Sequence, residues 1–156
     1  MSKTVVTTEA GKPYITIERE FDAPRAEVFK AMTSAEAIPL WWGPAGLTTI
    51  IDKLEGREGG MWRFVQKDPK GEYAFHGVYH EFSPERVIQT FEWEGMPERG
   101  HVIMEKMTLE EAGGKTKMKT LMTFMSVEDR DGMLQYGMEK GLNESHDRLA
   151  ALLANH

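Results

Sequence analysis

Most of the chain alternates between apolar and polar residues, which is the pattern of strands that bury one face. Gly, Pro, Asp and Ser interrupt this pattern at short intervals, as turn residues do. Short turns between successive strands favour an antiparallel meander. The pattern predicts seven strands, over residues 14–21, 47–54, 60–68, 72–83, 86–94, 101–111 and 115–125.

Between the first two of these strands, the apolar residues take helical spacing. In residues 22–33, Pro24 stands near a helix start and precedes an apolar stripe of Val28, Phe29 and Met32. Ser34 can cap a second, short helix over residues 35–42, and the Gly-Pro pair that follows should end it.

The end of the chain predicts one long helix. Ser126 and Asp129 form a capping box, and apolar residues then recur on one face of a helix of about 25 residues. His146 and Asp147 are expected on its solvated side. The inner face should carry Leu134, Met138, Leu142, Ser145, Leu149 and either Leu152 or Leu153.

These elements predict an α+β fold. An antiparallel sheet of this size must bury one face, and only the C-terminal helix is long enough to cover it. A curved seven-stranded sheet wrapped around that helix would leave inward residues that the helix cannot reach, so a cavity should remain. Residues 1–13 are expected to be a flexible arm, and residues 14–156 a single domain.

Strand parity selects the residues that should face this cavity. Large aromatic and Met side chains mixed with Gln are typical of a pocket lining, although each one alone fits an ordinary core. Gly137 and Gly141 lie four residues apart in the predicted C-terminal helix. Each glycine inside a helix costs about 1 kcal/mol relative to alanine. Their presence therefore suggests either close helix–sheet contact or room for a ligand beside the helix. The candidate ligand-binding residues are Trp42, Trp62, Phe64, Phe75, Tyr79, Gln89, Phe91, Trp93, Met107, Met122, Phe124, Met133, Gly137, Met138 and Gly141.

Three further side chains carry specific expectations. Trp41 and Trp42 are adjacent and cannot both enter one packing surface, so Trp41 is assigned to the core and Trp42 to the cavity mouth. Arg63 should lie outside, opposite Trp62, and pair with a carboxylate.

Glu105 shares the parity of apolar neighbours on its strand, which leaves two positions open: inside the cavity, or in a salt bridge at its rim. If it is inside, it is the weak candidate for a catalytic acid or base, or a polar anchor for a ligand.

Composition excludes several classes of function. The net charge of −6 argues against nucleic-acid binding, and the absence of cysteine removes disulfides and thiolate chemistry. His76 and His80 lie about 13 Å apart on one strand and cannot share a metal, so neither a metal nor a cofactor is expected. No signal peptide is visible and no apolar run reaches about 18 residues, which predicts a cytoplasmic protein without membrane insertion.

Four segments together resemble a known family: FDAPRAEVFKAMTSAEAIPLWWGP, REGGMWRFV, FHGVYHEFSPERVIQTFEW and VEDRDGMLQYGMEKGLNESHDRLAALL. They are similar to bacterial stand-alone members of the activator of Hsp90 ATPase homologue 1-like family, within the START/Bet v1-like (SRPBCC) superfamily of the helix-grip fold. The resemblance covers residues 14–154. Glu55 departs from it, because many relatives carry aspartate there.

The resemblance implies a hydrophobic cavity that accepts small apolar or amphipathic molecules. Three functions stay open at this point: binding of such a ligand, an enzyme of the cyclase, isomerase or hydrolase kind, and a module that contacts the chaperone Hsp90. A homodimer is also left open. The enzyme would draw its acid and base groups from Glu105, Gln89, Tyr79 or His101.

Overall fold

The computed structural model describes residues 3–155, and its strands form one antiparallel sheet of eight. The spatial order is β1-β2-β8-β7-β6-β5-β4-β3, so the meander from β3 to β8 is closed at one end by the N-terminal pair. The strands are β1 (Val5–Thr8), β2 (Tyr14–Phe21), β3 (Thr48–Leu54), β4 (Met61–Asp68), β5 (Gly71–Phe82), β6 (Arg86–Trp93), β7 (Ile103–Ala112) and β8 (Lys115–Thr123).

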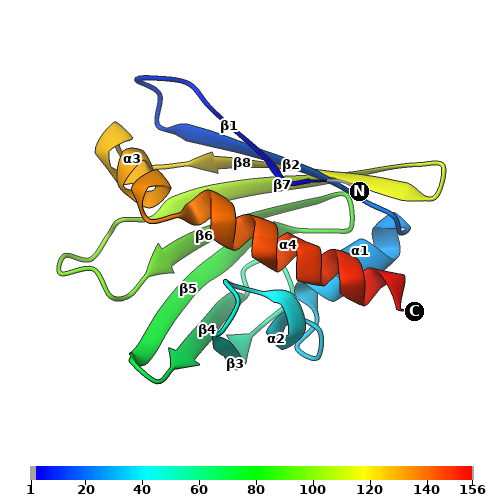
Figure 1. The fold of residues 1–156 in the computed structure, drawn as a ribbon, viewed down its shortest axis with the longest axis horizontal. Helices are drawn as coiled ribbons and strands as arrows, with labels where there is room; N and C mark the ends of the chain where they lie inside the picture. The colour runs from blue at the N-terminus through cyan, green and yellow to red at the C-terminus, as the bar shows by residue number, and fades with distance from the viewer. Residues whose placement is uncertain (1–2, 156) are drawn as a thin grey trace.

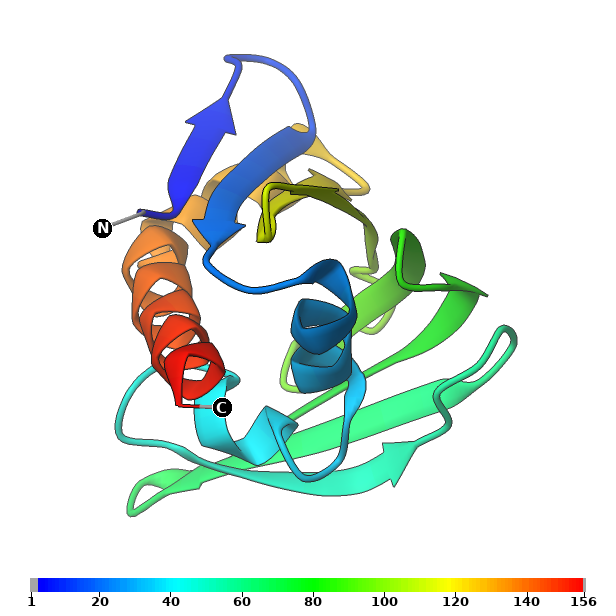
Figure 2. The same ribbon diagram turned by 90° about the vertical axis from the view of Figure 1, so that its right-hand side faces the viewer.

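Four helices lie on the concave side of this sheet. Two short ones, α1 (Arg25–Thr33) and α2 (Ile38–Trp41), connect β2 to β3, and α3 (Val127–Gln135) and α4 (Met138–Ala154) follow β8. Figure 1 shows α4 lying across the sheet, and Figure 2, which looks along α4, shows the sheet curving around the interior with α4 on its open side. The predicted helix-grip fold is confirmed, with one strand more than expected.

The additional strand lies in the segment predicted as a flexible arm. Val5–Thr8 pairs antiparallel with β2, from Val5 opposite Glu18 to Thr8 opposite Ile15. The prediction is therefore wrong for these residues, while residues 1 and 2 lie outside the described chain. Four β-branched residues suit a strand, but a stretch this short carries too little alternation to reveal one.

The predicted C-terminal helix is interrupted. Ser126 caps α3 as expected, since its hydroxyl accepts from the Asp129 backbone N–H at 3.0 Å. Gly137 then has a φ of 78°, a left-handed conformation that glycine adopts readily, and α4 starts in a new direction. The apolar spacing continues across the break, so periodicity alone predicted one helix. The second short helix is also shorter than predicted, Ile38–Trp41 instead of 35–42.

Side-chain bonds hold α4 at a fixed place over the sheet. The Ser145 hydroxyl donates to the Trp41 carbonyl at 2.9 Å, which joins α4 to α2. His146 Nδ1 lies 2.7 Å from Thr4 Oγ1, and Asp147 forms a 2.9 Å ion pair with Arg19 of β2. The expectation that His146 is solvated is wrong, because the N-terminal segment covers it and leaves it 5% exposed.

The burial of His146 predicts an acid-sensitive fold. Burial lowers the pKa of His146 to about 4, and the nearby Arg19 acts in the same direction. The unfolded chain takes up this proton near pH 6.5, the folded chain only near pH 4, so the stabilisation is complete above pH 6.5 and lost as pH falls. We expect a loss of about 3 kcal/mol in unfolding free energy across that window.

Urea unfolding at pH 7.5 and pH 4.5 measures this loss, with His146→Asn as the comparison. The variant is less stable at both pH values but should lose clearly less stability between them. Equal losses in the two proteins would show that other groups cause the acid sensitivity.

Candidate functional site

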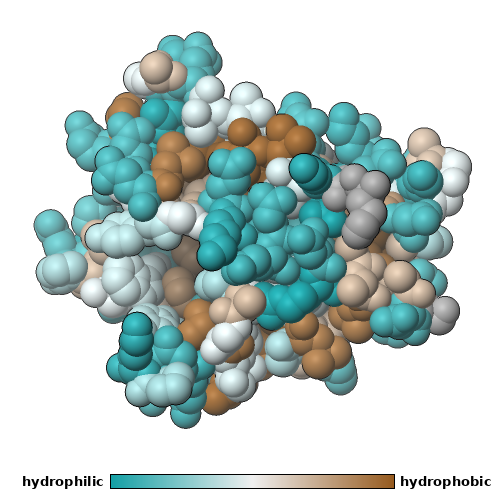
Figure 3. All heavy atoms as spheres, viewed as in Figure 1, coloured by the Kyte–Doolittle hydropathy of each residue, from teal (hydrophilic) through white to brown (hydrophobic). Residues whose placement is uncertain are grey.

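A cavity of about 470 Å³ lies between the concave face of the sheet and α4. Its lining comes from β2 and β4 to β8 on one side and from α1, α2 with the turn that follows it, the α3–α4 junction and α4 on the other. This volume is within the range of ligand sites in proteins and far exceeds the space of one water molecule. Figure 3 shows a hollow beside the first turns of α4, bordered by apolar side chains.

Aromatic rings form one wall of the cavity. Trp62 and Phe64 of β4 have ring centroids 4.7 Å apart, and Phe75 of β5 lies 5.3 Å from Phe91 of β6. Trp42 stands edge-on against this group, 5.1 Å from Phe64 and 5.4 Å from Phe75. Such edge-to-face contacts are favourable beyond the area they bury, so the rings stabilise one another in this wall.

The two adjacent tryptophans point to different environments. Trp41 is buried and its indole N–H donates to the Ala31 carbonyl at 2.9 Å, which fixes α2 against α1. Trp42 points toward the aromatic wall and is only partly buried. The structure therefore places Trp41 in the core, where one side of it also borders the cavity. Trp42 lies on the cavity against the aromatic wall.

A small polar cluster fixes the turn that follows Trp42. The Thr49 hydroxyl donates to the Trp42 carbonyl at 3.1 Å, and the Gln66 amide approaches the same carbonyl and the Thr49 hydroxyl at 3.4 Å. Gly43 has a φ of 90°, and a Cβ there would overlap the Gln66 amide. Arg148 of α4 also donates to the Gly43 carbonyl. The turn thus depends on glycine for its backbone angle and for the approach of Gln66.

A row of paired residues across β5, β6 and β7 carries the polar side of the cavity. Tyr79 lies opposite Gln89, and Gln89 lies opposite Glu105. The Gln89 amide donates to Glu105 Oε1 at 2.8 Å. Glu105 therefore faces the cavity and is not part of a rim salt bridge.

The surroundings of this row shift two ionisations. Burial raises the pKa of the Glu105 carboxyl, while the hydrogen bond from Gln89 acts in the opposite direction. Burial also raises the pKa of Tyr79 to about 12, and the charge of Glu105 adds to this. The Tyr79 phenol is therefore neutral at physiological pH. Glu105 is a carboxyl that accepts a proton, or a counter-charge, more readily than one at the surface.

Two residues assigned to the cavity from parity lie elsewhere. Trp93 shares the face of its partner Phe75, but it is the last residue of β6, and its ring lies over Gly95 in the next turn. Phe124 is buried in the core just beyond β8 without bordering the cavity. The other predicted ligand-binding residues do border it.

His101, proposed as an acid or base, is also outside the cavity. Its Nδ1 lies 3.0 Å from both carboxylate oxygens of Asp129, and this hydrogen bond raises the pKa of His101. His101 therefore connects the β6–β7 loop to the start of α3.

Other lining residues were not assigned from the sequence. Gln66 shares the parity of Trp62 and Phe64, so the strand pattern contained the signal. His146 and Thr33 give no such signal, because their exposure depends on how α4 and α1 are placed. Only the tertiary structure brings them to the cavity.

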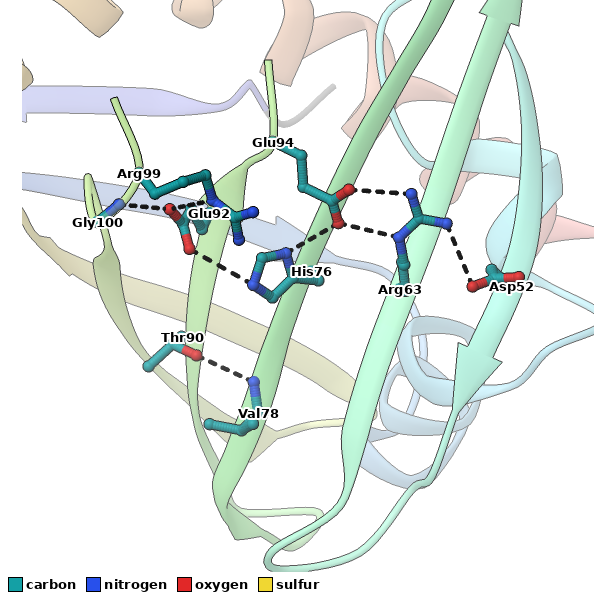
Figure 4. Close-up of polar contacts among 9 residues, drawn as sticks. All are labelled: Asp52, Arg63, His76, Val78, Thr90, Glu92, Glu94, Arg99 and Gly100. Atoms are coloured by element: carbon teal, nitrogen blue, oxygen red, sulfur yellow. Dashed lines mark hydrogen bonds and ion pairs between the residues drawn. The ribbon is translucent and has the colours of Figure 1, made fainter. Parts of the chain in front are cut away.

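The outer face of the same strands carries a cluster of ion pairs (Figure 4). Arg63 binds Glu94 with two hydrogen bonds of 2.9 Å and reaches Asp52 at 3.2 Å, which confirms its predicted outward position. His76 lies between Glu94 and Glu92, at 2.9 and 3.4 Å.

These contacts hold both carboxylates in their ionised form. The hydrogen bond from Arg63 lowers the pKa of Glu94, and the one from the Gly100 backbone lowers that of Glu92. The cluster fastens β3 to β6 and the following loop on the face away from the cavity.

Two further observations concern the described residues 3–155. They contain no group of three or more His, Cys, Asp or Glu side chains that could hold a metal ion. None of their helices has the length and apolar character that crossing a membrane would require.

Comparison with protein families identifies the chain. A model described as activator of Hsp90 ATPase homolog 1-like protein matches residues 22–154. The chain belongs to this family. The match confirms the resemblance drawn from the sequence and includes every element from α1 to the end of α4. Comparison with curated proteins finds no significant match.

Solved bacterial structures share the fold of this family member. A Rhodobacter sphaeroides protein is 20% identical with a TM-score of 0.89, and 99% of each chain is covered. An Arthrobacter aurescens protein is 22% identical, with a TM-score of 0.87 over 97% of this chain and 92% of the other. An AHSA1 protein from Silicibacter pomeroyi is 26% identical, with a TM-score of 0.72 over 92% and 99%.

The turn at Gly43 provides a test of how Gln66 fixes the segment that follows Trp42. Gly43 and Gly46 share a φ of 90°, but only Gly43 has Gln66 in the place of a Cβ. Gly46→Ala should therefore lower the unfolding free energy by about 1–2 kcal/mol, which is the cost of a non-glycine residue in this backbone conformation. Gly43→Ala should lose at least about 1 kcal/mol more, because it displaces a buried, hydrogen-bonded amide. Urea unfolding compares the two, and equal losses would show that Gln66 moves aside freely.

Proposed function

We propose that this protein binds a small hydrophobic or amphipathic molecule in the cavity between the sheet and α4. The supporting observation is an interior space of about 470 Å³ that is lined mainly by aromatic and methionine side chains and that α4 does not fill. The resemblance to the START/Bet v1-like superfamily supports the same function.

An unfilled apolar space of this size weakens a fold that has only a structural role. Atoms on its wall lack packing partners, and the dispersion energy they would gain is absent. Small residues of α4 keep the space open, since Gly141 and Ser145 border it where larger side chains would enter it. A ligand with an apolar body would supply the missing contacts.

We infer that the cavity opens at the junction of α3 and α4. Tyr136 borders the cavity and is 90% exposed, so its ring stands at the edge of the opening. Met133, Gly137 and Met138 continue this edge, and Pro44 lies across from Gly141. Methionine side chains adapt to ligands of different shape, and Gly137 interrupts the helix at this point.

A second candidate function is acid–base catalysis on a ligand in the same cavity. The observation that favours it is Glu105, a carboxyl with a raised pKa that faces the space. Its hydrogen-bond partner is the Gln89 amide, which does not transfer protons, so we place this function second. The cytoplasmic location, the homodimer and the Hsp90 contact stay predictions.

Filling the cavity from α4 tests the proposed function. At Gly141 a Cβ would stand 3.9 Å from Pro44, which is ordinary van der Waals contact, and the rest of a leucine side chain has the cavity beside it to enter. Gly141→Leu should keep or raise thermal stability, because glycine inside a helix destabilises it by about 1 kcal/mol relative to alanine and leucine does not. It should weaken binding of the neutral fluorescent probe N-phenyl-1-naphthylamine at least about tenfold, because the leucine occupies ligand space.

Gly132→Leu is the matched control. Gly132 lies in α3, has no atom within 4 Å of its Cβ position and does not border the cavity. It should gain stability in the same way and bind the probe as the natural protein does. Undiminished probe binding by Gly141→Leu would contradict the cavity as the binding site.

A further inference from the structure

The charges that border the cavity are unusually one-sided. Among the described residues, the lining contains no lysine and no arginine. Its acidic member is Glu105, and its histidine, His146, has a pKa lowered to about 4 and is neutral at physiological pH. The described cavity lining therefore holds one carboxyl and no lysine or arginine to balance it, whereas the carboxylates on the outer face are paired with Arg63 and Arg99.

The carboxyl of Glu105 is only partly satisfied by the protein. Oε1 accepts from Gln89, and no described residue donates to Oε2. Oε2 keeps some accessible surface, and Glu105 borders the cavity. This oxygen is therefore open to the cavity and is not sealed by protein atoms. A group on a bound molecule can reach it.

Two aromatic residues of the inner face stand near the same position. Tyr79 is two strands away in the same cross-strand row, and Phe91 is two residues beyond Gln89 on the adjacent strand. Diagonal neighbours on adjacent strands, such as Phe91 and Glu105, lie about 7–8 Å apart, within reach of an aromatic side chain. The aromatic wall continues to Trp62 and Trp42, whose rings lie 6.5 Å apart. The negative faces of aromatic rings attract cations.

We propose that the natural ligand carries one cationic amine on an apolar body, with the amine bound by Glu105 and the body against the aromatic wall. This inference rests on the proposed function and narrows its ligand class. The apolar cavity partly shields this carboxyl from bulk water, so an incoming ammonium supplies a counter-charge at a site whose lining provides none. An amphiphile with a carboxylate head, such as a fatty acid, would place two negative groups together and bind weakly.

Three probes with one naphthalene body separate these classes: 1-naphthylmethylamine, 1-naphthalenemethanol and 1-naphthoate. Isothermal titration calorimetry at pH 7 on the full chain measures each. We expect the amine to bind at least about tenfold more tightly than the alcohol, as charged hydrogen bonds allow, and the carboxylate to bind most weakly. This ranking requires no variant, so it does not depend on the folding of a mutant.

Glu105→Gln then tests the assigned residue. It should reduce amine affinity to that of the alcohol and leave alcohol binding within about threefold. Glu110→Gln is the control, because it makes the same change of charge at an exposed position of the same strand. The control should keep the ranking of the natural protein.

The outcomes distinguish this inference from the proposed function. Binding of the alcohol without a preference for the amine would overturn the amine assignment and leave the hydrophobic cavity as a binding site. A preference for the amine that survives Glu105→Gln would overturn the role of Glu105. Failure of all three probes and of N-phenyl-1-naphthylamine would overturn both proposals.

Discussion

The position of α4 over a curved sheet is the constraint on which the rest of the structure depends. The backbone neighbours of α4 are chiefly α2, α1 and α3, not the central strands. It is held from the side by Ser145 on Trp41, by His146 on Thr4 and by Asp147 on Arg19. Because α4 is held from the side, its backbone does not pack closely against the concave face of the sheet. Side chains fill the space between the two only in part.

The same strands therefore serve two chemical purposes through their alternation. On the outer face of β4 to β6, Arg63, His76 and Glu94 connect neighbouring strands in water-accessible ion pairs. On the inner face, many neighbouring residues are aromatic, and the cross-strand row of Tyr79 and Gln89 leads to the carboxyl of Glu105. The cavity thus acquires an apolar wall with a few polar groups and one carboxyl, an arrangement typical of ligand sites in proteins.

Local pattern was sufficient wherever a residue's position depended on its own strand. Parity placed Trp62, Phe75 and Phe91 on the cavity and Arg63 outside, because successive side chains of a strand face opposite ways. Parity gives the face and not the position along it. This is why Trp93, at the end of β6, shares the correct face and still misses the cavity.

The errors have a common physical origin in contacts between distant segments. β1 forms only because the edge of β2 is available to it, and His146 is buried only because that segment then covers it. The break at Gly137 is a choice of one backbone angle that hydrophobic spacing does not record. His101 was separated from the cavity by its bond to Asp129, which depends on where α3 begins.

The sequence by itself determined the order of the strands from β2 to β8, the outward and inward faces and the need for a covering helix, since these follow from alternation and burial within each segment. The tertiary structure alone decided the size of the cavity, its entrance and the exposure of Glu105 to it. Those properties depend on the gap between a curved sheet and a helix held at its side, and no local pattern in the chain encodes that distance.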